Sequence, residues 1–184
     1  MNENPRIEIM DTTLRDGEQT SGVSFVPHEK LMIARLLLEE LRVDRIEVAS
    51  ARVSEGEFNA VRMICDWAAR KNLLSRVEVL GFVDGKTSVD WIYNTGCRVI
   101  NLLTKGSEKH CTFQLKKTLQ EHLADIRQTV AYAIDKGMDV NVYLEDWSNG
   151  IKDSPDYVFG LVDGLKDTGI RRFMLPDTLG ILNP

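Results

Sequence analysis

The sequence predicts an α/β fold, namely the amino-terminal part of a (β/α)₈ TIM barrel that carries strands one to six. Three observations favour this fold. Apolar runs of strand length alternate with longer segments of helical period along nearly the whole chain, which is typical of a parallel sheet. Polar residues follow five of the six runs, as expected where chemistry lies at the carboxyl ends of many barrel strands. The first run is not followed by the glycine-rich phosphate turn of an open doubly wound sheet.

Each strand is predicted from an apolar run, and the first run reads as buried. The runs lie at residues 7–10, 45–49, 77–83, 98–103, 140–144 and 172–175. Helical spacing of apolar residues predicts five helices between them: one that opens at Pro27, then 56–71, 89–94, 119–136 and 155–166.

Helix ends are predicted from proline, serine and glycine. Pro27 and Pro155 suit the first helical position, and Ser154 suits the N-cap before Pro155. Gly96 predicts a left-handed stop after the helix at 89–94, and Gly137 marks the end of the helix at 119–136. Residues 104–117 are predicted to be a polar loop.

The chain is predicted to be one unit, an incomplete TIM-barrel catalytic domain over residues 1–184. It has 184 residues, of which 43% are hydrophobic, so it can bury one sizeable core. A full barrel needs two more strands and three more helices. Three interpretations remain open: a truncation, a fragment, or a sheet that another chain completes.

The charge balance excludes two classes of partner. The net charge is −5 and 28% of residues are charged, with both signs interspersed, so no basic surface for nucleic acid or a membrane is expected. No apolar run approaches membrane-spanning length and no signal core opens the chain. The sequence therefore predicts a cytoplasmic protein.

Cysteine and histidine give no metal pattern of their own. Cys65, Cys97 and Cys111 are widely spaced, which indicates neither a disulfide framework nor a zinc site but buried thiols. The three histidines do not pair at a ligand spacing, so surface or capping roles are expected for them; they are His28, His110 and His122.

The stretch from Asp11 to Gln19 concentrates polar residues after the first predicted strand. An isolated Arg15-Asp16 pair would be read as an ordinary surface pair. Here, however, Leu-Arg-Asp-Gly-Glu-Gln at residues 14–19, then ten residues, then Lys30, resembles the first signature of the α-isopropylmalate, homocitrate and citramalate synthase family. Residues 80–85, 101–107 and 143–150 are most similar to the citramalate branch of that family, and the resemblance covers nearly the whole chain.

The resemblance implies an acyltransferase that condenses acetyl-CoA with pyruvate to give (R)-citramalate and CoA in isoleucine biosynthesis. It also implies a homodimer for the full-length protein. Two alternatives stay open: a 2-isopropylmalate synthase acting on 2-ketoisovalerate, and a half-barrel that is an inactive fragment or a binding module. We expect the 184-residue chain alone to be inactive.

The resemblance also assigns roles to individual residues. Arg15 would stabilise the developing alkoxide, and Asp16 would be a catalytic residue and a ligand of a divalent metal, Mn²⁺ or Mg²⁺, with Zn²⁺ as a further option. Glu145 would help to polarise and orient acetyl-CoA, and the Thr178 hydroxyl would bind the keto-acid carboxylate. Three bulky residues would surround the substrate's alkyl group: Leu80, Leu103 and Tyr143.

The rest of the metal shell is expected outside this sequence. The family's second signature, a His-x-His pair with a nearby asparagine, lies beyond residue 184. Within the chain, Glu47 and Gln19 are candidates to support the site or to serve a structural role.

Overall fold

The computed structural model describes residues 6–182. Across them runs one six-stranded sheet in which every neighbouring pair is parallel and the strand order follows the sequence, β1-β2-β3-β4-β5-β6. The strands are Met10–Asp11 (β1), Arg45–Ser50 (β2), Val77–Phe82 (β3), Val99–Lys105 (β4), Asp139–Glu145 (β5) and Arg172–Met174 (β6).

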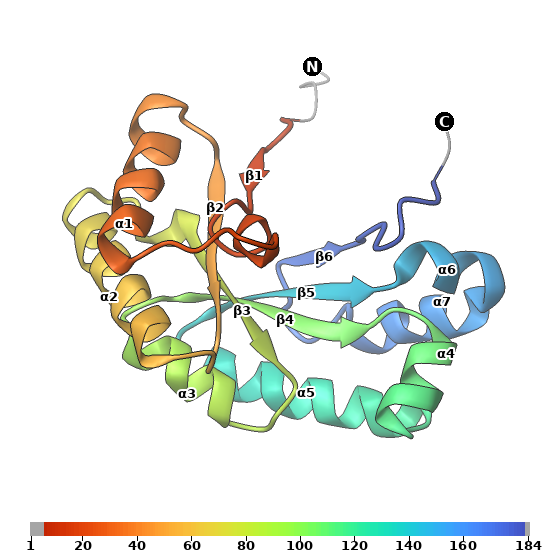
Figure 1. Cartoon of the computed structure of the whole chain (residues 1–184). Coiled ribbons are helices and arrows are strands. Elements are labelled where there is room, and N and C mark those ends of the chain that lie inside the picture. The colour runs from red at the N-terminus through yellow and green to blue at the C-terminus, as the bar shows by residue number, and fades with distance from the viewer. Residues whose placement is uncertain (1–5, 183–184) are drawn as a thin grey trace, which may run out of the picture.

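Helices connect successive strands and cover one side of the sheet (Figure 1). They are Pro27–Arg35 (α1), Glu55–Arg70 (α2), Thr87–Asn94 (α3), Glu108–His110 (α4), Leu119–Asp135 (α5), Trp147–Asp153 (α6) and Pro155–Leu165 (α7). Single 3₁₀ turns lie at Gly17–Gln19 (η1) and Leu74–Arg76 (η3), and π-helical turns at Leu36–Glu40 (η2) and Cys111–Leu115 (η4).

The sheet is curled into part of a barrel. Its two edge strands, β1 and β6, are far apart in the chain, yet Arg172 Nη2 lies 2.9 Å from the carboxylate of Glu8, just before β1. The fold is therefore the amino-terminal part of a TIM barrel, as the alternation of strands and helices predicted.

Alternation along each strand separates two kinds of side chain. Residues facing the helices are apolar and 0–1% exposed, among them Val48, Val79, Ile100, Val142 and Leu144. Each such burial contributes about 1.5–3 kcal/mol to stability. The opposite positions face the inside of the curl and are mostly polar, so the site lies on the inner side and the core on the outer side.

The first strand differs from its prediction. Residues 7–10 were expected to form a buried strand, but β1 covers only Met10–Asp11, and Ile7 and Ile9 are 86% and 60% exposed. The physical reason is that, within residues 6–182, β1 has a strand neighbour on one side only. Apolar side chains at such an edge gain little burial.

Two connections also differ from their predictions. Residues 104–117 were expected to be a loop, but β4 continues to Lys105 and α4 and η4 follow it. A further helix, α6, lies directly after β5, where none was predicted. Ser154 precedes α7, but its hydroxyl donates to the Gly150 carbonyl instead of capping the helix.

The remaining boundary predictions are confirmed. Pro27 and Pro155 open α1 and α7, and Gly96 and Gly137 have φ of +91° and +75°. The three cysteines are free and buried. No helix among residues 6–182 is both long and apolar enough to cross a membrane.

Candidate functional site

The loop after β1 is folded tightly on its own backbone. The carbonyl of Thr12 accepts hydrogen bonds from the N–H groups of Arg15 and Asp16, at 3.0 and 2.8 Å, and Asp11 accepts from the N–H of Thr13 at 2.9 Å. Leu14 points the other way and is 1% exposed. Burial of Leu14 therefore turns Arg15 and Asp16 toward the inside of the curl.

Arg15 is held by two carboxylates. Its Nε lies 2.5 Å from Glu47 Oε2, and its Nη1 lies 2.8 Å from Asp16 Oδ1. Burial alone would lower the pKa of Arg15, but the charge and hydrogen bond of Glu47, together with its neighbours Tyr143 and Asp16, outweigh burial and the pKa is raised. Among residues 6–182 no carboxylate or carbonyl accepts a hydrogen bond from its third nitrogen, Nη2, and the Tyr143 hydroxyl lies close to the guanidinium, so Nη2 can bind an anionic ligand.

Glu47 was a candidate to support the site, and the structure places it directly behind Arg15. Its side chain is fully buried, which raises the pKa of the carboxyl even though Arg15 and Asn101 both favour the charged form. Asn101 Nδ2 donates to its second oxygen at 2.7 Å. The carboxylate is thus bonded at both oxygens and cannot turn away from Arg15.

A row of buried polar side chains continues from Glu47 across the sheet. Asn141 Nδ2 donates to Asn101 Oδ1 at 2.9 Å and lies 3.4 Å from Glu78 Oε2. Arg45 Nη1 in turn donates to Glu78 at 3.0 Å. Sequence reasoning missed these residues. The available signal was a polar residue in the middle of each otherwise apolar strand, at paired register positions such as Asn101 and Asn141.

One cavity of about 510 Å³ collects the residues that the resemblance singled out. It lies at the carboxyl ends of all six strands, β1 to β6. The predicted residues that line it are Arg15, Asp16, Gln19, Leu80, Leu103, Tyr143, Glu145 and Thr178, and the additional ones are Ser50, Phe82, Pro176 and Asp177. Segments up to 163 positions apart in sequence therefore meet in one place.

Each predicted residue has a defined setting in this cavity. Glu145 is ion-paired with Lys105 across the paired ends of β5 and β4. The Tyr143 ring lies 6.0 Å from the Arg15 guanidinium carbon, and burial, with the charge of Glu47, raises the pKa of its hydroxyl so that it stays protonated. Thr178 Oγ1 accepts the backbone N–H of Asp146 at 3.0 Å.

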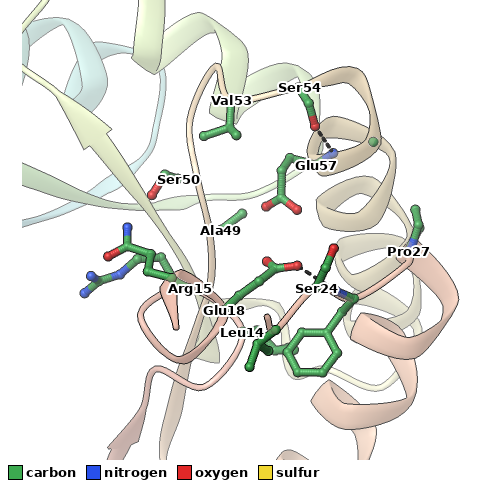
Figure 2. Close-up of a pocket in the computed structure, with 14 residues that line it drawn as sticks. Leu14, Arg15, Glu18, Ser24, Pro27, Ala49, Ser50, Val53, Ser54 and Glu57 are labelled. Carbon is green, nitrogen blue, oxygen red and sulfur yellow. Dashed lines mark hydrogen bonds between the residues drawn. The ribbon is translucent and has the colours of Figure 1, made fainter. Parts of the chain in front are cut away.

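A second hollow, of about 400 Å³, adjoins the first and shares Arg15, Gln19 and Ser50 with it. Figure 2 shows the carboxylates of Glu18 and Glu57 pointing toward one another in this hollow. Both bind Lys30, which is fully buried, at 2.5 and 2.6 Å.

Lys30 belongs to the signature but had no predicted role. Its ammonium also donates to the Leu14 carbonyl at 3.2 Å, and Glu18 accepts the N–H of Phe25 at 2.9 Å. Lys30, on α1, therefore connects α1 to the loop after β1 and, through Glu57, to α2.

One histidine differs from its expected surface role. His122, on α5, is 1% exposed, and its Nδ1 lies 3.0 Å from the Tyr157 hydroxyl. Burial lowers the pKa of His122 to about 4. The period of α5 placed His122 on the face that packs against α7, which apolar spacing alone did not reveal.

A divalent cation would find only part of a shell here. The Asp16 side chain is 62% exposed and lines the cavity, and within the described part of the chain its one bonded partner is Arg15, so it can offer oxygen to a cation. Within residues 6–182, no three histidine, cysteine or carboxylate side chains converge as metal ligands. The donor set therefore fits one ligand of a hard cation and leaves the other ligands to residues elsewhere.

The comparisons with known proteins identify the family of the chain. The family model described as HMGL-like matches residues 6–184. The chain belongs to the HMGL-like family.

Named relatives of this HMGL-like chain carry two different activities. The 2-isopropylmalate synthase of Saccharolobus solfataricus is 38% identical over 180 residues, covering 97% of this chain and 44% of that protein. The (R)-citramalate synthase of Methanocaldococcus jannaschii is 33% identical over 178 residues, covering 97% of this chain and 34% of that protein. The chain thus spans less than half the length of these relatives, and the similarity does not separate the two activities.

Solved structures support the fold of this HMGL-like chain. The crystal structure of Bacillus subtilis HMG-CoA lyase matches with a TM-score of 0.70 at 22% identity, covering 100% of this chain and 62% of that one. The HMG-CoA lyase from Acinetobacter baumannii, solved in complex with coenzyme A and 3-methylmalate, matches with a TM-score of 0.62 at 20% identity, covering 96% of this chain and 58% of that one.

Proposed function

We propose that residues 1–184 form the amino-terminal part of the catalytic domain of a cytoplasmic synthase that condenses acetyl-CoA with pyruvate, giving (R)-citramalate and CoA. The observation that carries the proposal is the cavity in which Arg15, Asp16, Glu145 and Thr178 lie together. The relatives named citramalate synthase and 2-isopropylmalate synthase support the reaction class.

The chemistry requires a carbon nucleophile and a polarised ketone. A base removes a proton from the acetyl methyl group, and the resulting carbanion attacks the ketone carbon of the 2-oxo acid. The electron pair of the ketone moves to oxygen, and water then hydrolyses the thioester and releases CoA. In this scheme Nη2 of Arg15 stabilises the negative oxygen, because arginine is permanently charged and its bonds to Glu47 and Asp16 use Nε and Nη1.

The other cavity residues have complementary roles. Glu145 orients the acetyl group and assists the proton transfer, and its partner Lys105 keeps the carboxylate in place. The hydroxyl of Thr178 binds the carboxylate of the 2-oxo acid. Asp16 would hold a divalent cation, Mn²⁺ or Mg²⁺, which when bound would act as a Lewis acid on the ketone.

Pyruvate is favoured over larger 2-oxo acids by the walls of the cavity. Leu80, Leu103 and Tyr143 line the cavity from the neighbouring strands β3, β4 and β5, and Leu103 and Tyr143 are directly paired in register. Bulky walls leave room for a methyl group and little for an isopropyl group. The second candidate is a 2-isopropylmalate synthase, which the relative at 38% identity favours.

A thiol-release assay tests the proposal. The full-length protein that contains this chain, with acetyl-CoA and Mn²⁺, should release CoA faster with pyruvate than with 2-ketoisovalerate, and the isolated 184-residue chain should release none. Arg15→Lys should abolish most turnover, since a single ammonium lacks the planar, separately placed Nε and Nη2 donors that face Glu47 and the ligand. Turnover by the isolated chain would contradict the inference that its metal shell is incomplete. If the full-length protein turned over neither acid, the synthase proposal would be refuted.

A further inference from the structure

Asp146, directly after Glu145, has a backbone conformation that non-glycine residues rarely adopt. Its φ and ψ are +65° and +28°, in the left-handed region. Aspartate and asparagine are the side-chain-bearing residues most often found there, because their short polar groups can bond locally. The turn ends β5 and starts α6, so it sets the direction in which the chain leaves the site.

The side chain of Asp146 is what holds this turn. It is 4% exposed, and its two oxygens accept hydrogen bonds from Ser107 Oγ at 2.8 Å and from Asn149 Nδ2 at 2.7 Å. His110 Nε2 lies 3.5 Å from the same oxygen that Ser107 binds. Burial works against the charged form, but these donors outweigh it and the pKa of Asp146 is lowered. The carboxylate thus ties the segment after β4 to α6.

The left-handed turn directs one N–H group toward the cavity. The N–H of Asp146 donates to Thr178 Oγ1 at 3.0 Å. A hydroxyl has one proton to donate and two lone pairs to accept with. With one lone pair occupied, and with no acceptor for the proton among residues 6–182, the Thr178 hydroxyl is left to donate its proton to a ligand.

We propose that Asp146 is a positioning residue for the 2-oxo acid: its buried carboxylate holds the left-handed turn whose N–H makes the Thr178 hydroxyl a hydrogen-bond donor to the substrate carboxylate. The inference rests on the proposed function, because it takes Thr178 as the contact for that carboxylate. It adds Asp146 as the residue that makes the Thr178 hydroxyl the donor in this contact. Asp146 itself touches neither substrate nor metal.

The test is a mutant cycle in the full-length protein, read as the Kd of pyruvate in the presence of Mn²⁺ by calorimetry. Asp146→Gly keeps the left-handed conformation accessible but removes both side-chain bonds, and it should raise the Kd about tenfold, as expected for one hydrogen bond to a charged group. Thr178→Val should raise it similarly. Combining the two should add nothing further, since Asp146 acts only through Thr178.

Two further variants keep the test decisive. Asn72→Gly changes another left-handed residue, after α2 and away from the cavity, and should leave the Kd unchanged. Asp146→Asn keeps one of the two side-chain bonds, so its Kd for pyruvate should lie between those of the wild type and Asp146→Gly. In the Thr178→Val background, Asp146→Asn should have no effect on the Kd. This variant carries the test if Asp146→Gly does not fold.

The outcomes separate this inference from the proposed function. The KM for acetyl-CoA should stay unchanged in Asp146→Gly, whereas general damage to the site would raise both constants. An unchanged pyruvate Kd in Asp146→Gly, or equal losses in the wild-type and Thr178→Val backgrounds, would overturn the role of Asp146 alone. A wild-type protein that binds neither pyruvate nor 2-ketoisovalerate would overturn the proposed function and this inference with it.

Discussion

Arg15 Nε lies 2.5 Å from Glu47 Oε2, although the two residues are 32 positions apart in the sequence. The pair fixes the guanidinium at the mouth of the cavity, because Glu47 is buried and bonded at its other oxygen to Asn101. An arginine that is already oriented needs no reorganisation when negative charge develops on a bound ligand.

Glu47→Gln in the full-length protein should therefore lower kcat about 100-fold, because the neutral amide no longer holds Arg15. Steady-state kinetics with pyruvate measure the effect. Asp44→Asn is a matched control. Asp44 lies just before β2, the strand that carries Glu47, and its substitution weakens a carboxylate–arginine pair with Arg6 away from the cavity. Equal loss in both variants would indicate general damage instead of loss of Arg15 orientation.

Stability should fall in mild acid because of His122. Its pKa is 6.5 when exposed and about 4 in the fold, so between these values the unfolded chain binds more protons. The free energy of unfolding should thus decrease by about 3 kcal/mol as the pH falls from 6.5 to 4. Urea denaturation at several pH values measures the slope.

The matched substitutions for this pH effect are His122→Asn and His28→Asn. An asparagine can still bond to the Tyr157 hydroxyl but does not titrate, so His122→Asn should flatten the pH dependence by about the same 3 kcal/mol. His28 is exposed on α1, and its substitution should leave the profile as it is. An unchanged slope in His122→Asn would show that other groups cause the acid sensitivity.

Lys30→Met should destabilise the protein by about 3 kcal/mol, because it leaves Glu18 and Glu57 facing one another without a cation. Adding Glu18→Gln and Glu57→Gln should recover part of the loss. Lys71→Met removes an exposed, solvent-screened pair with Glu39 and should cost much less than Lys30→Met. Urea denaturation compares the free energies of unfolding of the variants. Equal losses for Lys30→Met and Lys71→Met would contradict a stabilising role for the buried ion pairs of Lys30.

Leu80→Ala in the full-length protein should shift selectivity toward larger 2-oxo acids. Loss of the side chain enlarges the cavity, so the ratio of kcat/KM for 2-ketoisovalerate to that for pyruvate should rise about tenfold. Phe113→Ala, an exposed residue of η4, is the control. An unchanged ratio in Leu80→Ala would refute the assignment of this wall to the alkyl group.

The chain order of strands and helices was predictable because each element is a local pattern. The apolar runs of β2 to β6 and the proline and glycine signals at Pro27, Pro155, Gly96 and Gly137 depend only on neighbouring residues. The prediction of the first strand was wrong because burial of Ile7 and Ile9 depends on neighbours on both sides of β1. The helices α4 and α6 were missed because short helical turns carry too few residues to show a period.

The sequence by itself determined that Arg15, Asp16, Glu145 and Thr178 stand at the carboxyl ends of parallel strands, because strand direction follows from chain order. It could not show that Glu47 and Asn101 bind one another behind Arg15, that Lys30 is buried between two carboxylates, or that Asp146 turns its N–H toward Thr178. Those relationships depend on the curl and register of the sheet, which bring distant segments within hydrogen-bonding distance. Only the tertiary structure decides them, since no local pattern encodes a contact between residues dozens of positions apart.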